Sequence, residues 1–313
     1  MGVSSFGLML LAALSGVCLS LIGVAFKIGQ GRGVIPLHIS MCMGIAGAIV
    51  FGVQMDWHNL GVLPLFVWGM VLLTTLGQLL AMHLVKICLR MGPLSPLWAA
   101  MNLTFLPVIL YSALFLSESI RIMEMAAIFA GILTVVFASQ TTGGPSTGEE
   151  ETAAKHGMKT KLTYSLLLVL VLMGNSLVFI VIKDLGTRTV TPGSGGTWLA
   201  MYIAPIYFLM YASLALFSGA ASWMQKARPD RVRDLVMLGA LAAAGSIAGL
   251  VLLKISIPLP AALVFTLSGV MTIVSGAVAS VVFFREPVFW AWYGTVGFGV
   301  LAVLLANLGP WLS

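Results

Sequence analysis

The chain has few charged residues. Only 8% of its 313 residues are Asp, Glu, Lys or Arg, whereas a soluble domain carries about 25%. So few charges cannot cover a water-exposed surface, which excludes an ordinary cytosolic enzyme, a disordered protein and a nucleic-acid-binding protein. Because 60% of the residues are hydrophobic, the composition predicts a polytopic membrane protein.

Cysteine and chemical motifs are scarce as well. The three cysteines, Cys18, Cys42 and Cys88, lie in or beside apolar segments at irregular spacing, which predicts neither a disulfide framework nor a metal site. There is no Walker phosphate loop, HExxH or CxxC motif, and no acidic pair inside an apolar segment. We therefore expect no cofactor, no enzymatic activity and no ion coupling of the carboxylate type.

Long apolar segments dominate what is present. Residues 1–26 lack the basic region and cleavage pattern of a signal peptide, so we expect a first spanning helix there. A bilayer-spanning helix needs about 20 apolar residues. Ten segments meet or approach this length, with boundaries near 5–26, 34–54, 63–85, 95–117, 123–139, 162–182, 197–218, 235–253, 259–284 and 288–307.

A polar segment divides the ten segments into two sets of five. Residues 140–161 contain glycines, a proline, three consecutive glutamates and three lysines, which is typical of a flexible linker. We therefore expect one five-helix half at 1–139 and another at 162–313.

Residues of the same type recur at fixed offsets in the two halves. Three pairs differ by 168 positions: Lys86 with Lys254, Glu118 with Glu286, and Gly131 with Gly299. Three further pairs differ by 156 positions: Ser20 with Ser176, Lys27 with Lys183, and Arg32 with Arg188. One insertion or deletion accounts for the change of offset. Because each half has an odd number of helices, the second copy would cross the membrane in the opposite sense, an arrangement that recurs in secondary transporters.

These motifs resemble a known transporter family. They comprise Lys-Ile-Cys-Leu-Arg-Met-Gly-Pro-Leu-Ser-Pro at 86–96, Glu118 with Gly131, the segment 254–260, Arg285-Glu286-Pro287 with Gly299, and Gly-Asn-Ser at 174–176. In these motifs the chain resembles the drug/metabolite transporter superfamily, in particular its EamA-like members. The resemblance implies an all-α fold of ten transmembrane helices in two inverted five-helix repeats around a central cavity, and export or exchange of small metabolites by alternating access. The second half lacks a counterpart of Arg90, and it has Val270 opposite Asn102.

Two indicators of topology disagree. Twelve of the 16 Lys and Arg residues fall on the side of the loops that follow the first, third, fifth, seventh and ninth segments. The excess of basic residues in cytoplasmic loops then places both termini outside. The family resemblance implies cytoplasmic termini, so the orientation stays open.

Polar residues inside spanning segments usually face a bundle interior or a water-filled cavity. Pro107 interrupts the fourth segment and should free the carbonyl of Leu103, which makes nearby Asn102 the strongest candidate for binding. An asparagine can equally join two helices. His83 could carry a proton or simply hydrogen-bond within the bundle. The candidate substrate-binding residues are Gln78, His83, Trp98, Asn102, Asn175, Tyr207, Ser268 and Thr272.

Four lysines at the ends of predicted helices are candidate pathway charges: Lys27, Lys86, Lys183 and Lys254. Each can instead extend its ammonium group to the lipid headgroups. Glu118 and Glu286 are expected to cap the helices that follow them.

The sequence thus predicts a secondary transporter of a small organic metabolite such as an amino acid. The alternatives are an organic-phosphate or nucleotide-sugar exchanger, favoured if the helix-end lysines face the cavity, and a lipid-modifying intramembrane enzyme. The expected partners are a small-molecule substrate and membrane lipids, not nucleic acid. The expected location is the inner membrane, as a monomer or homodimer.

Overall fold

The computed structural model describes residues 5–91, 94–117, 120, 122–140, 150–188, 198–225, 232–256, 261–286, 288 and 290–312. All regular elements among these residues are helices. They are α1 (Ser5–Gly31), α2 (Pro36–Gln54), α3 (Trp57–Val62), α4 (Leu65–Met91), α5 (Leu94–Met101), α6 (Phe105–Phe115), α7 (Ile122–Gln140), α8 (Glu150–Thr187), α9 (Trp198–Met224), α10 (Val232–Ile255), α11 (Ala261–Val282) and α12 (Trp290–Leu312).

Each predicted apolar segment coincides with helical structure. Within the described residues, seven helices are long and apolar enough to cross a membrane, and three shorter apolar stretches lie at Ile122–Ala138, Leu267–Val282 and Trp290–Ala306. The fourth segment consists of two helices, α5 and α6. The prediction of a helical membrane protein is confirmed.

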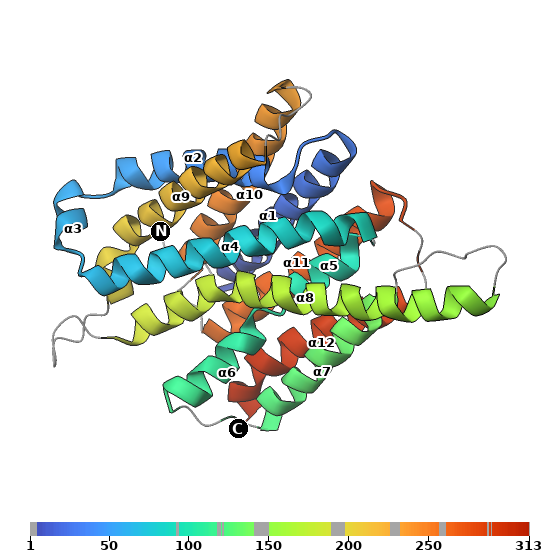
Figure 1. The fold of residues 1–313 in the computed structure, drawn as a ribbon. Coiled ribbons are helices and arrows are strands. Elements are labelled where there is room, and N and C mark those ends of the chain that lie inside the picture. Colours follow the sequence, from blue (N-terminus) through green and yellow to red (C-terminus); the bar gives the residue numbers. More distant parts are fainter. Residues whose placement is uncertain are drawn as a thin grey trace.

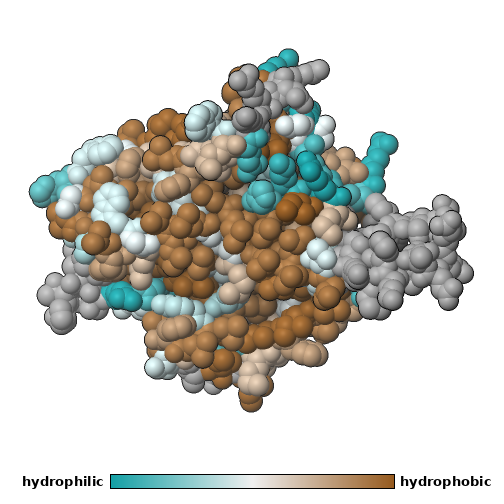
Figure 2. All heavy atoms as spheres, viewed as in Figure 1, coloured by the Kyte–Doolittle hydropathy of each residue, from teal (hydrophilic) through white to brown (hydrophobic). Residues whose placement is uncertain are grey.

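The helices pack as neighbours across the two halves of the chain. In Figure 1, α4 lies beside α8, α7 beside α12, and α2 beside α9, while α1 packs against α10 and α11. Apolar residues cover much of the face seen in Figure 2, and hydrophilic residues gather toward its edges. A lipid-facing surface requires this distribution.

Glycines allow the closest of these contacts. A Cβ atom on Gly77 of α4 would lie 2.8 Å from the carbonyl oxygen of Gly174 in α8, and one on Gly174 would lie 2.6 Å from the oxygen of Gly77. A Cβ on Gly245 of α10 would lie 2.5 Å from the carbonyl oxygen of Cys18 in α1. Small residues let membrane helices approach at backbone distance.

The chain between the halves differs from the prediction. Helix α8 begins at Glu150, so residues 150–161, expected to belong to a flexible linker, form the first turns of a 38-residue helix. The sequence offers a reason. Residues 150–161 are rich in Glu, Ala, Lys and Met, which have high helix propensity. The predicted linker residues 141–149 lie outside the described part of the chain.

Candidate functional site

A cavity of about 200 Å³ lies among α1, α2, α4, α5, α8, α9, α10 and α11. Gln78, Tyr211 and Thr272, which line it, stand near the midpoints of α4, α9 and α11. The cavity therefore lies near the middle of the helical bundle. It is larger than the cavity of about 150 Å³ that admits benzene in an engineered protein core, so it can hold a small organic molecule.

The fourth apolar segment breaks beside this cavity. Helix α5 ends at Met101 and α6 begins at Phe105. Pro107 has no N–H to donate, and its ring would collide with the carbonyl of Leu103 in a continuous helix. The restart at Phe105 places Pro107 in a first turn, where that donor is not needed. The predicted free carbonyl at Leu103 is not observed, because the N–H of Leu106 donates to it at 2.9 Å.

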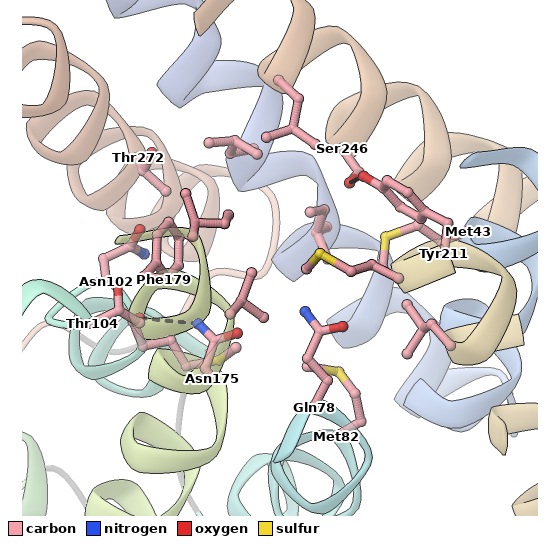
Figure 3. A pocket seen from close by; sticks show the side chains of 18 of the residues that line it. Met43, Gln78, Met82, Asn102, Thr104, Asn175, Phe179, Tyr211, Ser246 and Thr272 are labelled. Atoms are coloured by element: carbon pink, nitrogen blue, oxygen red, sulfur yellow. Dashed lines mark hydrogen bonds between the residues drawn. The ribbon is translucent and has the colours of Figure 1, made fainter. Parts of the chain in front are cut away.

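Two asparagines stabilise the broken end of α5. The Nδ2 of Asn102 donates to the carbonyl oxygen of Trp98 at 2.8 Å. The Nδ2 of Asn175, in α8, donates to the carbonyl oxygen of Met101 at 3.4 Å, a long and therefore weak bond. Both residues line the cavity, and Figure 3 shows the latter bond as a dashed line. Asn175 thus joins α8 to α5 and also lines the cavity, whereas the bond of Asn102 to Trp98 stays within its own segment and joins no second helix.

Gln78 contributes a free amide. It lines the cavity, and no hydrogen bond joins its side chain to any other residue that the structure describes. In Figure 3 the amide extends from α4 into the space between Asn175 on one side and Tyr211 on the other. An uncommitted amide offers two donors and an acceptor to a bound molecule.

Apolar and aromatic side chains complete the walls. The Trp98 indole is wedged between two glycines, since a Cβ on Gly23 would come within 2.8 Å of the ring and one on Gly276 would collide with it. The indole Nε1, which has no partner among the described residues, lies against Gly276. Across the cavity, the Tyr211 hydroxyl and Ser246 Oγ are 2.7 Å apart.

Six of the eight candidate binding residues line this cavity: Gln78, Trp98, Asn102, Asn175, Tyr207 and Thr272. The other two do not. His83 is exposed on the outer face of α4. Ser268 is buried between helices, where its Oγ accepts a hydrogen bond from Ser15 Oγ at 2.9 Å.

The candidate pathway lysines whose side chains the structure describes lie elsewhere. Lys27 forms an ion pair with Glu286, with 2.9 Å between Nζ and Oε1. Lys183 lines a separate pocket with Glu124, and Lys86 is half-buried on α4. The Lys254 side chain lies outside the described set. No lysine is among the described residues that line the central cavity.

Among the residues that the structure describes, Glu286 bonds to none in the helix that follows it. Its carboxylate accepts two hydrogen bonds from the N–H of Leu94, at 2.9 and 3.0 Å, and one from Ser280 Oγ. It therefore caps α5, nearly two hundred positions earlier in the chain. The expectation of a local cap was wrong, because α5 brings its unsatisfied N-terminal N–H groups to the loop after α11. Glu118 lies outside the described residues.

The sequence analysis missed a second buried acid. Asp184, near the end of α8, is 1% exposed. It accepts a hydrogen bond from the Tyr111 hydroxyl at 2.8 Å and forms an ion pair with Arg188. Hydrogen bonding to Asp184 raises the pKa of Arg188. The sequence did carry one signal for this pair: Arg188 follows Asp184 by four positions, a spacing that brings an acid and a base together on one face of a helix.

Three further polar residues that line the cavity, Thr104, Tyr211 and Ser246, were not among the candidate binding residues. Threonine and serine are common in packed membrane helices, so their type alone does not identify a site. In the described part of the chain no group of three His, Cys, Asp or Glu residues is arranged to hold a metal ion.

Comparison with known proteins identifies the fold alone. No family model matches the sequence, and no curated protein matches it. Twelve chains of solved structures match the fold. One of them, described only as a crystal structure of a protein, superposes with a TM-score of 0.58 at 16% identity, over 95% of this chain and 96% of its own.

Proposed function

We propose that this protein is a secondary transporter that moves a small organic metabolite, such as an amino acid, across the inner membrane by alternating access. The observation that carries the proposal is the cavity near the middle of the bundle, beside the break between α5 and α6. Discontinuous helices with irregular backbone at mid-membrane depth are typical of transporter binding sites. Polar residues inside spanning segments usually face the bundle interior or a water-filled cavity, and the asparagines and Gln78 face this one.

The proposal includes ten membrane-spanning segments in two inverted halves. Two observations support it. Ser117 and Arg285, separated by 168 positions, both have positive φ, at 55° and 50°. Helices α1 and α8, the first of each half, run in opposite directions (Figure 1), and α1 packs on α10 as α8 packs on α4. Inverted repeats pair helices in this reciprocal way.

The cavity favours a small metabolite over a phosphate ester or a nucleotide sugar. Phosphate recognition usually depends on Arg or Lys, and neither is among the described lining residues. A volume of about 200 Å³ is also small for a nucleotide sugar. The enzyme alternative has less support still, because His83, the candidate base, is exposed on the outer face of α4.

The test is uptake by the purified protein in liposomes, with pooled amino acids, sugars, nucleosides and phosphorylated metabolites, with and without a pH gradient. Gln78→Leu should lower the rate of saturable uptake at least tenfold, because it removes the free amide. His83→Leu provides a matched control on the same helix and should leave the rate within twofold. The absence of saturable uptake from every pool with folded protein would contradict the proposal, as would a Gln78→Leu variant as active as the parent protein.

A further inference from the structure

Many residues that line the cavity occur in pairs, at the same offsets of 156 and 168 positions that the sequence repeats. The pairs in α1 and α8 differ by 156 positions, and those in α4 and α10 differ by 168. They are Leu19 with Asn175, Ile22 with Val178, Phe26 with Ile182, Gln78 with Ser246, and Met82 with Leu250. The two members of a pair can therefore be compared directly.

Paired residues differ in their exposure. Phe26 is 1% exposed and Met82 is buried, whereas their partners Ile182 and Leu250 are partly exposed. Phe179, which also lines the cavity from α8, is 42% exposed. Each of these residues lies toward the C-terminal end of its helix, and α1 and α8 run in opposite directions (Figure 1). The cavity is therefore closed at the end of the bundle where α1 and α4 terminate, the α1 end, and open at the end where α8 and α10 terminate, the α8 end.

Side chains of α1 bind other helices at the closed end. Gln30, in the last turn of α1, donates from Nε2 to the carbonyl oxygen of Leu89 in α4 at 2.8 Å. That oxygen is among the last four carbonyls of α4, which have no partner inside a helix. One turn earlier, Lys27 pairs with Glu286, which caps α5. The end of α1 is thus joined to two elements that line the cavity, α4 and α5.

The bond from Gln30 lies beside a buried apolar stripe. Val85 and Leu89 follow Met82 by three and seven positions, so they continue the face of α4 that lines the cavity. Both are buried, Val85 to 1% exposure. Water can reach this stripe from the α1 end only if α1 and α4 separate there, and that separation breaks the bond from Gln30.

The other half of the chain has no side chain for the same bond. The residue 156 positions after Gln30 is Gly186. The Lys–Glu pair differs in this respect, since Lys27 and Glu286 both recur in the sequence, as Lys183 and Glu118. The glutamine is therefore particular to the α1 end.

We propose that the hydrogen bond from Gln30 to the Leu89 carbonyl is a latch that closes the cavity at the α1 end and biases the empty protein toward the state open at the α8 end. The inference rests on the proposed alternating access and adds the residue that sets the resting state. Because glycine stands at the equivalent position, the α8 end has no matching latch and opens more readily.

The test measures how fast a cysteine beneath the latch reacts with a water-soluble maleimide. The purified full-length protein is used in detergent, where both ends of the bundle meet water. Val85→Cys is the reporter, and alanine replaces Cys18, Cys42 and Cys88. Because Val85 is buried, only molecules open at the α1 end react, and the rate follows their population. Gln30→Leu removes the donor and should raise the rate about threefold to tenfold, the shift that one net hydrogen bond provides.

Two other substitutions of Gln30 test the chemistry of the latch. Gln30→Glu places a carboxylate against the Leu89 carbonyl and should raise the rate more than Gln30→Leu does. Gln30→Lys keeps an N–H donor and adds a positive charge, which the C-terminal end of α4 favours, so the rate should stay within twofold of the parent rate. A side chain that only fills space would not produce this order.

Gln140→Leu is the matched control. Gln140 ends α7 at the same end of the bundle and accepts a hydrogen bond from Lys161 of α8 at 3.2 Å, so the same substitution again removes one bond between helices. No described residue of α7 lines the cavity. The labelling rate of Val85→Cys should therefore stay within twofold. An increase as large as that of Gln30→Leu would contradict the latch.

A second reporter distinguishes opening from general loosening. Ala302 is buried in α12, which packs on α5, α7 and α11, and Ala302→Cys should react equally slowly with Gln30 or Leu at position 30. Equal increases at both reporters, or an unchanged rate for Val85→Cys in folded Gln30→Leu, would overturn the inference. If Val85→Cys does not fold, Leu89→Cys serves as the reporter, because it keeps the backbone carbonyl.

The latch and the transport function can fail separately, because labelling needs no substrate. Saturable uptake together with an unresponsive Val85→Cys reporter would refute the latch and leave transport intact. The expected order of labelling rates supports the latch whichever pooled compound is transported.

Discussion

Ser117 and Arg285 adopt the same uncommon backbone conformation 168 positions apart, with φ values of 55° and 50°. Both side chains are exposed, and each residue comes directly before a Glu in the sequence. A left-handed conformation costs a residue with a Cβ atom roughly 1–2 kcal/mol. The two residues stand in the loops after α6 and α11, and both loops therefore contain one strained residue.

Glycine at either position should therefore stabilise the protein. We expect Ser117→Gly and Arg285→Gly each to raise the free energy of unfolding by up to about 1 kcal/mol, part of the relief being offset by the greater freedom of glycine in the unfolded chain. Thermal unfolding in detergent measures this effect. The matched controls Ser117→Ala and Arg285→Ala keep the Cβ atom and should bring no such gain. An equal gain in the alanine variants would show that backbone strain is not the cause.

Lys27 and Glu286 form an ion pair, and replacing Glu286 should destabilise the protein more than replacing Lys27. Glu286→Ala removes the ion pair and the acceptors for Leu94 and Ser280, so we expect a loss of about 2–3 kcal/mol. Lys27→Ala leaves Glu286 hydrogen-bonded to the other two groups and should cost about 1 kcal/mol. Melting temperatures of the single variants provide the comparison.

The exchanged pair supplies a sharper control. Combining Lys27→Glu with Glu286→Lys preserves opposite charges, yet a lysine cannot accept hydrogen bonds from Leu94 N–H. We therefore expect the double variant to remain as unstable as Glu286→Ala. Full recovery of the melting temperature would mean that charge attraction alone holds the cluster together.

The sequence was sufficient to predict the helical segments but not which side of each helix faces inward. A long apolar run identifies a membrane helix because lipid and protein interior are both apolar. For the same reason, the run does not tell which face of the helix contacts lipid and which contacts the other helices. Gln78 and His83 illustrate this. Five positions correspond to about 140° around a helix, so the inward position of Gln78 turns His83 outward. The two residues could not both have faced the cavity.

Interactions between distant parts of the chain were beyond prediction for a different reason. Glu286 caps a helix that starts at Leu94, and only the packed bundle brings these residues together. Asn102 was identifiable because Pro107 predicts a local break. Asn175 could be placed at the same break only after α8 was packed against α5.

The contact between Trp98 and Gly276 should control the shape of the cavity. Alanine at Gly276 would place a Cβ atom in the indole ring, and Trp98 cannot retreat because Gly23 closes its other side. We expect Gly276→Ala to reduce transport at least tenfold and to lower stability by about 1–3 kcal/mol. Uptake and thermal unfolding of the same preparation measure the two effects.

Two further variants check this cause. A Cβ atom on Gly297, in α12, would meet only open space, so Gly297→Ala should leave both quantities unchanged. Adding Trp98→Leu to Gly276→Ala should restore stability in part, because the smaller side chain makes room for the methyl group. No recovery in the double variant would indicate that Gly276 acts through something other than Trp98.

The ion pair of Asp184 and Arg188 should respond asymmetrically to neutralisation. The Asp184 side chain is 2% exposed, whereas that of Arg188 is 52% exposed. Removing the base leaves a buried carboxylate with one hydroxyl partner, Tyr111. Removing the acid leaves a guanidinium that water can reach. Because an unpaired buried charge is the costlier state, Arg188→Gln should destabilise the protein more than Asp184→Asn does.

A double-mutant cycle tests that order. We expect the combined variant, Asp184→Asn with Arg188→Gln, to be more stable than Arg188→Gln alone, with a coupling free energy of about 1–2 kcal/mol. Tyr111→Phe should add to the instability of Arg188→Gln, because it removes the last hydroxyl donor to the carboxylate. If Asp184→Asn proved the more damaging single change, the acid would act mainly as a hydrogen-bond acceptor for Tyr111 rather than as a buried charge that needs its partner.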